Sequence, residues 1–247
     1  MAAFILVTDA VHPHPRETVR WPMLRQRWAT FAAVHWPYEP LTVQSLLPDP
    51  LVVESFEGSA WVSLTPFVME GMRPPIAPAM PWLSTYPEAN VRTYARHPSG
   101  RDGLWFFSLD VGRLAVALTG RAMFRLPYMW AGMEVTREAG VIRYGAQRRW
   151  GGPGGSFDLA VSEGQALGAD AGPLDHFLTA RWGSFSTGPL RMTYTPVEHQ
   201  PWPLRRASVE RLDQSLVEAA GLPSPTRDPV VHVSPGVDVK LGFPQPI

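Results

Sequence analysis

The stretch YPEANVRTY, residues 86–94, alternates polar and small or apolar side chains with a period of two. As a β-strand it points Glu88, Asn90, Arg92 and Tyr94 to one face. The polar face then either meets solvent, where Glu88 and Arg92 form a weak surface pair, or lines a closed cavity. In a cavity, the carboxylate and the guanidinium would keep each other charged and orient a small polar ligand. The stretch alone leaves both interpretations open.

The segments around this stretch show the same strand pattern and are joined by turn residues such as Glu57-Gly58 and Glu138-Ala139-Gly140. Hairpins are expected from three pairs of segments, which are residues 51–56 with 60–69, 88–96 with 104–110, and 128–137 with 141–149. Single strands are expected at residues 157–161, 191–197, 230–233 and 237–241. This pattern predicts a mainly β (α+β) fold with a closed or strongly curved antiparallel sheet.

A few helices are expected beside the sheet. Starting near Trp21, four residues follow at spacings of four, three and four, which predicts a helix that ends before Pro37. These four are Leu24, Trp28, Phe31 and His35. Further helical segments are expected at residues 41–47, 173–180 and 208–220, the last with Ser208 as its N-cap. Residues 111–124 fit either a helix or a strand.

Composition excludes several classes of protein. The 247 residues are 45% hydrophobic, and 22 basic residues balance 22 acidic ones, which argues against a nucleic-acid-binding protein. The absence of cysteine excludes disulfides, thiolate nucleophiles and Cys-ligated zinc. The histidines do not follow a metal-binding spacing, and we expect neither a metal nor a cofactor. No apolar run is long enough to cross a membrane, so we expect a cytoplasmic protein that makes no membrane contact.

No polar linker or repeat divides the chain, so we expect an irregular N-terminal arm at residues 1–19 and a single domain at residues 20–247. A homodimer is the assembly most common for such a chain. Lys240 is the only lysine, so an amine nucleophile can only be Lys240 or the N-terminus.

Several segments together resemble a known family in their order and spacing over about residues 21–240. They are Arg27-Trp28, His35-Trp36-Pro37, GSAWVSLTPF at 58–67, residues 88–94, FFSLD at 106–110, LPY at 126–128, EHQPWPL at 198–204 and HVSPGVDV at 232–239. The chain resembles the YqjF-like family, domain of unknown function 2071. The resemblance implies the fold of acetoacetate decarboxylase, a curved antiparallel sheet that closes into a cone-like barrel around a pocket, with a few peripheral helices. It therefore favours the cavity interpretation of the Glu88 face.

The chain departs from the decarboxylase at the catalytic lysine. That enzyme forms a Schiff base through a buried lysine whose pKa a second lysine lowers. Where the resemblance would place this pair, the chain carries Arg113, Arg121 and Arg125. Because arginine stays protonated and forms no imine, and because Lys240 lies outside any matching motif, we predict no Schiff-base decarboxylation.

The candidate site residues follow from the cavity interpretation. We predict that Glu88 is an acid–base or ligand-orienting group and that Arg92 binds a carboxylate or enolate oxygen. The predicted ligand contacts are Asn90, the hydroxyls of Tyr94 and Tyr128, and the imidazoles of His35, His199 and His232 as proton carriers. The ligand would be a small anionic metabolite of the keto-acid type. Whether it is turned over by non-covalent acid–base chemistry is left open. The alternative is a ligand-sensing or protein-interaction module without catalysis, whose barrel could also be filled by side chains.

Overall fold

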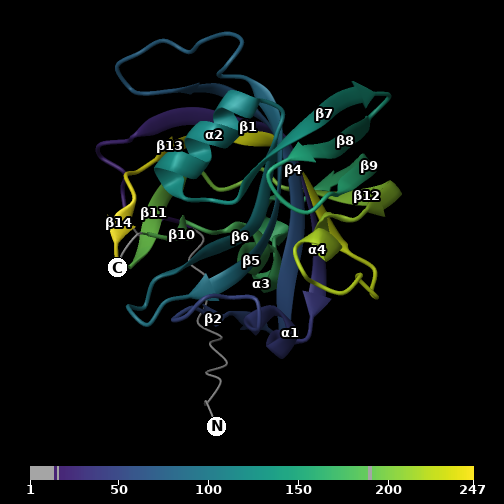
Figure 1. The fold of residues 1–247 in the computed structure, drawn as a ribbon. Coiled ribbons are helices and arrows are strands. Elements are labelled where there is room, and N and C mark those ends of the chain that lie inside the picture. The colour runs from purple at the N-terminus through teal and green to yellow at the C-terminus, as the bar shows by residue number, and fades with distance from the viewer. Residues whose placement is uncertain (1–13, 16, 189–190) are drawn as a thin grey trace.

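The computed structural model describes residues 14–15, 17–188 and 191–247, and β-strands dominate it (Figure 1). The strands are β1 (Leu24–Tyr38), β2 (Val52–Val53), β3 (Ser55–Phe56), β4 (Ser59–Arg73), β5 (Tyr86–Arg96), β6 (Asp102–Val111), β7 (Tyr128–Glu138), β8 (Val141–Trp150), β9 (Ser156–Ala166), β10 (Gly183–Thr187), β11 (Met192–His199), β12 (Arg205–Gln214), β13 (Val230–Leu241) and β14 (Gln245–Pro246). The helices are α1 (Pro40–Gln44), α2 (Leu114–Phe124), α3 (Pro173–Thr179) and α4 (Leu216–Ala219), with a 3₁₀ turn at Gly168–Asp170. Most of the predicted arm, residues 1–19, lies outside the described residues.

Nine strands close into a ring. The neighbours run β6-β7-β8-β9-β12-β13-β1-β4-β5, and the ring closes because β5 also pairs with β6. The three predicted hairpin turns join β3 to β4, β5 to β6 and β7 to β8. The prediction of a mainly β, curved and closing sheet is therefore confirmed. Most neighbours are antiparallel, but β6 pairs in parallel with β7 and β10.

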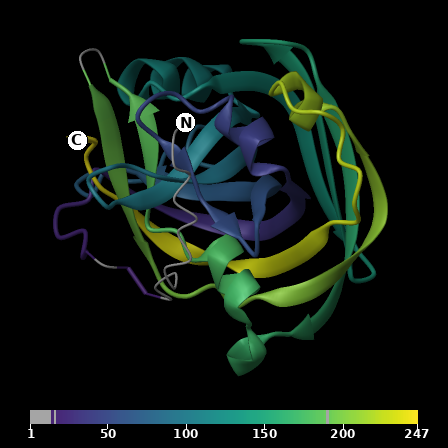
Figure 2. The same cartoon turned by 90° about the horizontal axis from the view of Figure 1, so that it is seen from below.

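A second, smaller ring shares one wall with the first. β10 pairs with β6, β11 pairs with β10, and β11 returns to β13 through pairs such as Val197 with Leu241. The five strands β13-β1-β4-β5-β6 therefore belong to both rings, and we call them the shared wall. Figure 2 shows the sheet curving round from below, with β10 and β11 in green on the left.

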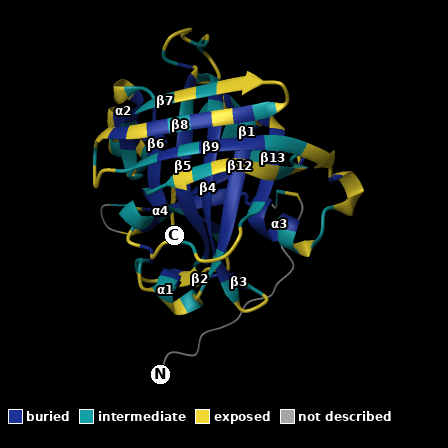
Figure 3. Ribbon diagram, turned by 90° about the vertical axis from the view of Figure 1, so that its right-hand side faces the viewer, coloured by how far each residue is buried: buried dark blue, intermediate teal, exposed yellow. Residues whose placement is uncertain are grey.

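Because side chains alternate along a strand, the two faces of each strand in the shared wall point into different rings. Ala89, Val91 and Ala95 of β5 pack with Tyr144 and Leu159 in a continuous hydrophobic core, which fills the nine-strand ring. The intervening residues of β5 face the smaller ring. Figure 3 shows the consequence for burial: the shared wall is mostly dark blue, whereas β7, β8 and β12 carry exposed residues on their outer side.

The predicted helix over residues 21–36 is wrong, because this segment is strand β1. The strand carries a bulge at Thr30, whose φ is 46°, and its register to β4 shifts between Ala29 and Val34. The inserted residue keeps Trp28 and Phe31 on the same side, so both line the smaller ring. Gln26 also lines this ring and Ala33 packs with Phe31, so the inward face has the period of a strand interrupted by one bulge. The larger residues chosen from it happen to be spaced by four, three and four, as on a helix.

Two predictions near the C-terminus also fail. Residues 208–220 were predicted as one helix, but strand β12 ends at Gln214 and only Leu216–Ala219 form helix α4. β12 has mostly exposed residues and a register shift between Val209 and Arg211, so it lacks the alternation that marks a strand. Residues 230–241 form one strand, β13, instead of two.

The segments that were predicted near residues 41–47 and 173–180 are α1 and α3, and residues 114–124 form helix α2. None of the helices in the described part of the chain is long and apolar enough to span a membrane.

Candidate ligand-binding site

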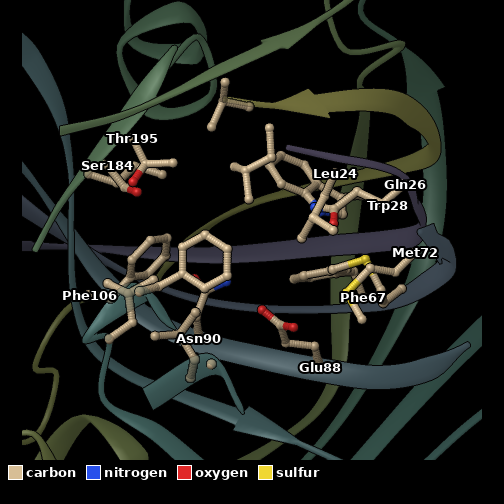
Figure 4. A pocket seen from close by; sticks show the side chains of 18 of the residues that line it. Leu24, Gln26, Trp28, Phe67, Met72, Glu88, Asn90, Phe106, Ser184 and Thr195 are labelled. Carbon is tan, nitrogen blue, oxygen red and sulfur yellow. The ribbon is translucent and has the colours of Figure 1, made fainter. Parts of the chain in front are cut away.

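The smaller ring encloses a cavity of about 210 Å³. Its wall comes from strands β1, β4, β5, β6, β10 and β11, and helix α2 lies over it. Most of its lining is apolar, with Phe31, Phe67 and Phe106 among the aromatic side chains. Figure 4 shows the carboxyl group of Glu88 pointing from β5 into this space.

The polar face of β5 lines the cavity and does not meet solvent. Glu88, Asn90 and Arg92 all line the cavity, and their exposed fractions are 4%, 3% and 8%. Tyr94 continues the same face but lies fully buried beyond the cavity lining. Its hydroxyl donates a hydrogen bond to the carbonyl oxygen of Leu178 at 2.8 Å. Of the two interpretations of this strand, the structure therefore agrees with the cavity.

Glu88 is a buried carboxyl group that forms no ion pair with any residue the structure describes. Its Oε2 atom makes no hydrogen bond to any described residue. Burial raises its pKa to about 8, and the nearby carboxylate of Asp110 adds to this shift. At neutral pH the group is therefore mostly protonated. The expectation that Glu88 and Arg92 keep each other charged is wrong: four residues of extended strand, about 13 Å, separate their Cα atoms. Neither group shifts the pKa of the other.

Arg92 is a buried cation without a carboxylate partner among the described residues. Its Nε atom has no hydrogen-bond acceptor. Burial lowers the pKa of Arg92, Tyr94 partly offsets this shift, and the cation of Arg181 reinforces it. The guanidinium nevertheless stays charged. The charge on this part of the cavity is therefore uncompensated.

Arg181 lines the cavity near Arg92 and was not predicted from the sequence. Its charge is compensated, because it forms a buried ion pair with Glu54 and lies 3.5 Å from Asp102. Its guanidinium also lies over the rings of Tyr94 and Phe177. Arg181 follows α3 in a connecting segment with no recognisable pattern, so no sequence signal could have found it.

Tyr128 and His199 line the cavity as predicted contacts. Burial and the neighbouring Glu88 raise the pKa of Tyr128, so its hydroxyl remains a hydrogen-bond donor. The ring of Tyr128 packs on α2 at Gly120, where an added Cβ would lie 2.6 Å from the ring. Burial lowers the pKa of His199 to about 4, which keeps this imidazole neutral at physiological pH.

His35 and His232 do not line the cavity and lie in a separate buried cluster. The Nδ1 atom of His35 is 2.6 Å from Ser63 Oγ, and the Nε2 atom of His232 is 2.8 Å from Asp175 Oδ1. The two imidazole rings lie 5.3 Å apart. Neither imidazole contacts the cavity, so no contact supports their predicted role as proton carriers for the ligand.

The lysine side chain, the only one in the sequence, lies outside the cavity. Lys240 donates a hydrogen bond to Glu198 at 2.7 Å on the surface. Over residues 14–15, 17–188 and 191–247, no group of three or more histidine, aspartate or glutamate side chains is arranged to hold a metal ion.

The comparisons with known proteins agree with this architecture. Residues 25–238 match the model of domain of unknown function 2071, described as an uncharacterized conserved protein. The chain belongs to this family. It is 31% identical to the uncharacterized protein YqjF of Bacillus subtilis (strain 168) over 218 residues, which cover 88% of this chain and 89% of the relative.

Solved structures with the same fold include an acetoacetate decarboxylase-like enzyme from Sphingomonas wittichii RW1. It has a TM-score of 0.63 and 15% identity and covers 94% of this chain and 95% of its own. The enduracididine biosynthesis enzyme MppR, complexed with pyruvate, has a TM-score of 0.59 and 13% identity over 94% and 93% of the two chains. These likenesses establish an acetoacetate decarboxylase-like fold.

Proposed function

We propose that this protein binds a small keto-acid anion in the cavity of the smaller ring. The observation that carries the proposal is the buried guanidinium of Arg92, which has no carboxylate partner among the described residues. A buried charge is costly unless an opposite charge pairs with it. A ligand carboxylate would supply that charge in a bidentate geometry.

Glu88 lies four residues, about 13 Å, from Arg92 along β5, so it would contact a part of the ligand remote from the carboxylate. Because its pKa is about 8, most of the population at pH 7 carries a proton that can be donated to a ligand acceptor there. The ionised fraction is a stronger base than an ordinary carboxylate and can take that proton back. This acid–base chemistry needs no covalent intermediate.

Two further points support a keto acid without an imine. MppR, a neighbour with the same fold, is complexed with pyruvate, a keto acid. In this chain the single lysine lies outside the cavity, so the side chains that surround the ligand contain no primary amine. The proposed chemistry is therefore non-covalent.

The experiment is a thermal-shift and calorimetric titration with a panel of keto acids. Wild-type protein should bind at least one of them, and Arg92→Met should weaken binding at least tenfold. Arg143→Met, on the exposed side of β8, is the matched control and should bind like wild type. If Arg92→Met binds every acid as well as wild type does, the site lies elsewhere.

The second candidate function is ligand sensing without turnover. Helix α2 favours it, because Val116 and Gly120 line the cavity while Leu114 and Leu118 on the same helix are exposed. A ligand could therefore alter an exposed apolar surface directly. Incubation of the bound acid with the protein, followed by mass spectrometry, separates the two functions: an enzyme converts the acid, and a sensor returns it intact.

A further inference from the structure

The cavity is polar at one end and apolar at the other. We propose that its ligand carries a bulky apolar substituent: a 2-oxo acid with an aryl or extended alkyl side chain, held with its carboxylate at Arg92 and its side chain toward α2. This inference rests on the proposed function and adds the class of ligand to it.

The polar end is defined by three strands and the segment before β10. Arg92 and Arg181 line it, together with the hydroxyl-bearing Ser184 and Thr195, which face each other across β10 and β11. Ser184 is also paired with Leu104 of β6, two positions from Phe106, the partner of Arg92. Hydroxyl and guanidinium donors at one level of the ring provide several hydrogen bonds for a carboxylate.

The apolar end begins at Glu88 and extends to α2. Phe67 pairs with Glu88 across β4 and β5, and Met69 pairs with Tyr86 one step further on. Leu24 and Met72 close this end, and Figure 4 shows both on the side opposite Ser184 and Thr195. Apart from Glu88, which is mostly neutral at pH 7, no Asp, Glu, Lys or Arg lines this end among the described residues.

The length of the cavity along β5 limits the size of ligand that can fill both its polar and its apolar end. The Cα atoms of Glu88 and Arg92 are about 13 Å apart along β5, so a three-carbon acid bound at Arg92 does not extend through the apolar end beyond Glu88. With such an acid the apolar end would stay filled with water or empty. Each methylene moved from water to this end should strengthen binding about threefold to fourfold.

A calorimetric series with one head group tests the inference. The probes are pyruvate, 2-oxobutanoate, 2-oxohexanoate and phenylpyruvate. We expect the dissociation constant to fall about tenfold or more from pyruvate to 2-oxohexanoate and phenylpyruvate. Because this series uses the wild-type protein, its outcome does not depend on whether any variant folds.

A matched pair of variants on α2 locates the side chain. Met123 lines the cavity and is 61% exposed, whereas Leu118 is exposed on the same helix and does not line it. Met123→Glu should weaken phenylpyruvate about tenfold and leave pyruvate unchanged, and Leu118→Glu should change neither. If both variants weaken phenylpyruvate binding equally, the side chain of the ligand does not lie at α2.

The failures of the two proposals are distinguishable. If all four acids bind with similar affinity and all depend on Arg92, the keto-acid proposal stands and the apolar side chain is overturned. If none of them binds, the keto-acid proposal itself fails.

Discussion

Arg148 on β8 holds both carboxylate oxygens of Asp110 on β6. The distances Nε–Oδ1 and Nη2–Oδ2 are both 2.7 Å, and the two side chains are 2% and 1% exposed. Nη2 also donates to Ser108 Oγ at 3.1 Å, and Nη1 donates to the carbonyl oxygen of Pro153. Since the carboxylate of Asp110 is one cause of the raised pKa of Glu88, this pair connects the interior of the nine-strand ring to the ligand cavity.

Breaking this pair should destabilise the protein strongly. Arg148→Met leaves the carboxylate of Asp110 buried without its cation, and we expect the free energy of unfolding to fall by about 3–5 kcal/mol. The double variant Asp110→Asn, Arg148→Met removes the stranded charge and should recover part of that loss. Urea denaturation of the two single variants and the double variant measures the coupling. Additive losses would show that the two side chains do not depend on each other.

The stability of the protein should depend on pH through Glu88. Because its pKa is about 8 in the folded state and 4.5 is the reference value, the folded state binds the proton more tightly. The resulting stabilisation is complete below pH 4.5 and is lost as pH rises to about 8. Glu88→Gln cannot ionise. Urea denaturation at several pH values should therefore show wild-type stability falling relative to Glu88→Gln between pH 5 and 8, and parallel curves would contradict the raised pKa.

We expect Arg92 to lower the stability of the ligand-free protein, because its role is to bind the ligand. Replacing an uncompensated buried cation with methionine removes a desolvation cost, so Arg92→Met should unfold at the same or a higher urea concentration than wild type. The same variant should lose the thermal shift with keto acids. A large loss of stability on this substitution would mean that Arg92 has a structural role and would remove the main argument for an anionic ligand.

No imine should form on this protein. Lys240 is paired with Glu198 at the surface, away from the cavity. Incubation with a keto acid that binds, followed by borohydride reduction and intact-mass spectrometry, should leave the mass of the chain unchanged. Lys240→Arg should bind keto acids with wild-type affinity. A covalent adduct that maps to Lys240 would contradict the non-covalent mechanism.

Gly236 should tolerate no side chain. It lies in β13 opposite the bulged part of β1, with φ at 122°, and an added Cβ would be 2.2 Å from the carbonyl oxygen of Trp28. Gly236→Ala should therefore lower the melting temperature by several degrees or prevent folding. Gly58→Ala is the matched control, because its φ is also positive but the space around it is open. Equal losses from the two variants would show that the close contact at Trp28 is unimportant.

The sequence was most informative where one face of a strand differs sharply from the other. The alternation of residues 86–94 predicted which side chains of β5 share a face, and turn residues located the hairpin from β5 to β6. It was misleading at β1, where the bulge at Thr30 interrupts the period of two and the larger inward residues happen to be spaced as on a helix. A bulge is set by the pairing of distant strands, so a local pattern cannot show it.

The site could be predicted only in part, for a related reason. Glu88, Asn90 and Arg92 lie on one strand, and their common face follows from the sequence. Arg181 and Ser184 reach the cavity only because β10 pairs in parallel with β6, a contact between segments about 80 residues apart. The protonation of Glu88 is equally nonlocal, since it depends on burial by other strands and on Asp110 of β6.

The shared wall has a consequence for how this protein can change. Along β5, Ala89, Val91 and Ala95 belong to a packed core, whereas Glu88 and Arg92 border an open cavity. Substitutions at the second set alter what is bound and leave the packing of the larger ring intact. The cavity-facing residues of β5 can therefore change during evolution, and so change the ligand, with little effect on folding. For protein engineering, the cavity-facing positions of β5 are therefore the ones to randomise, with their neighbours left unchanged.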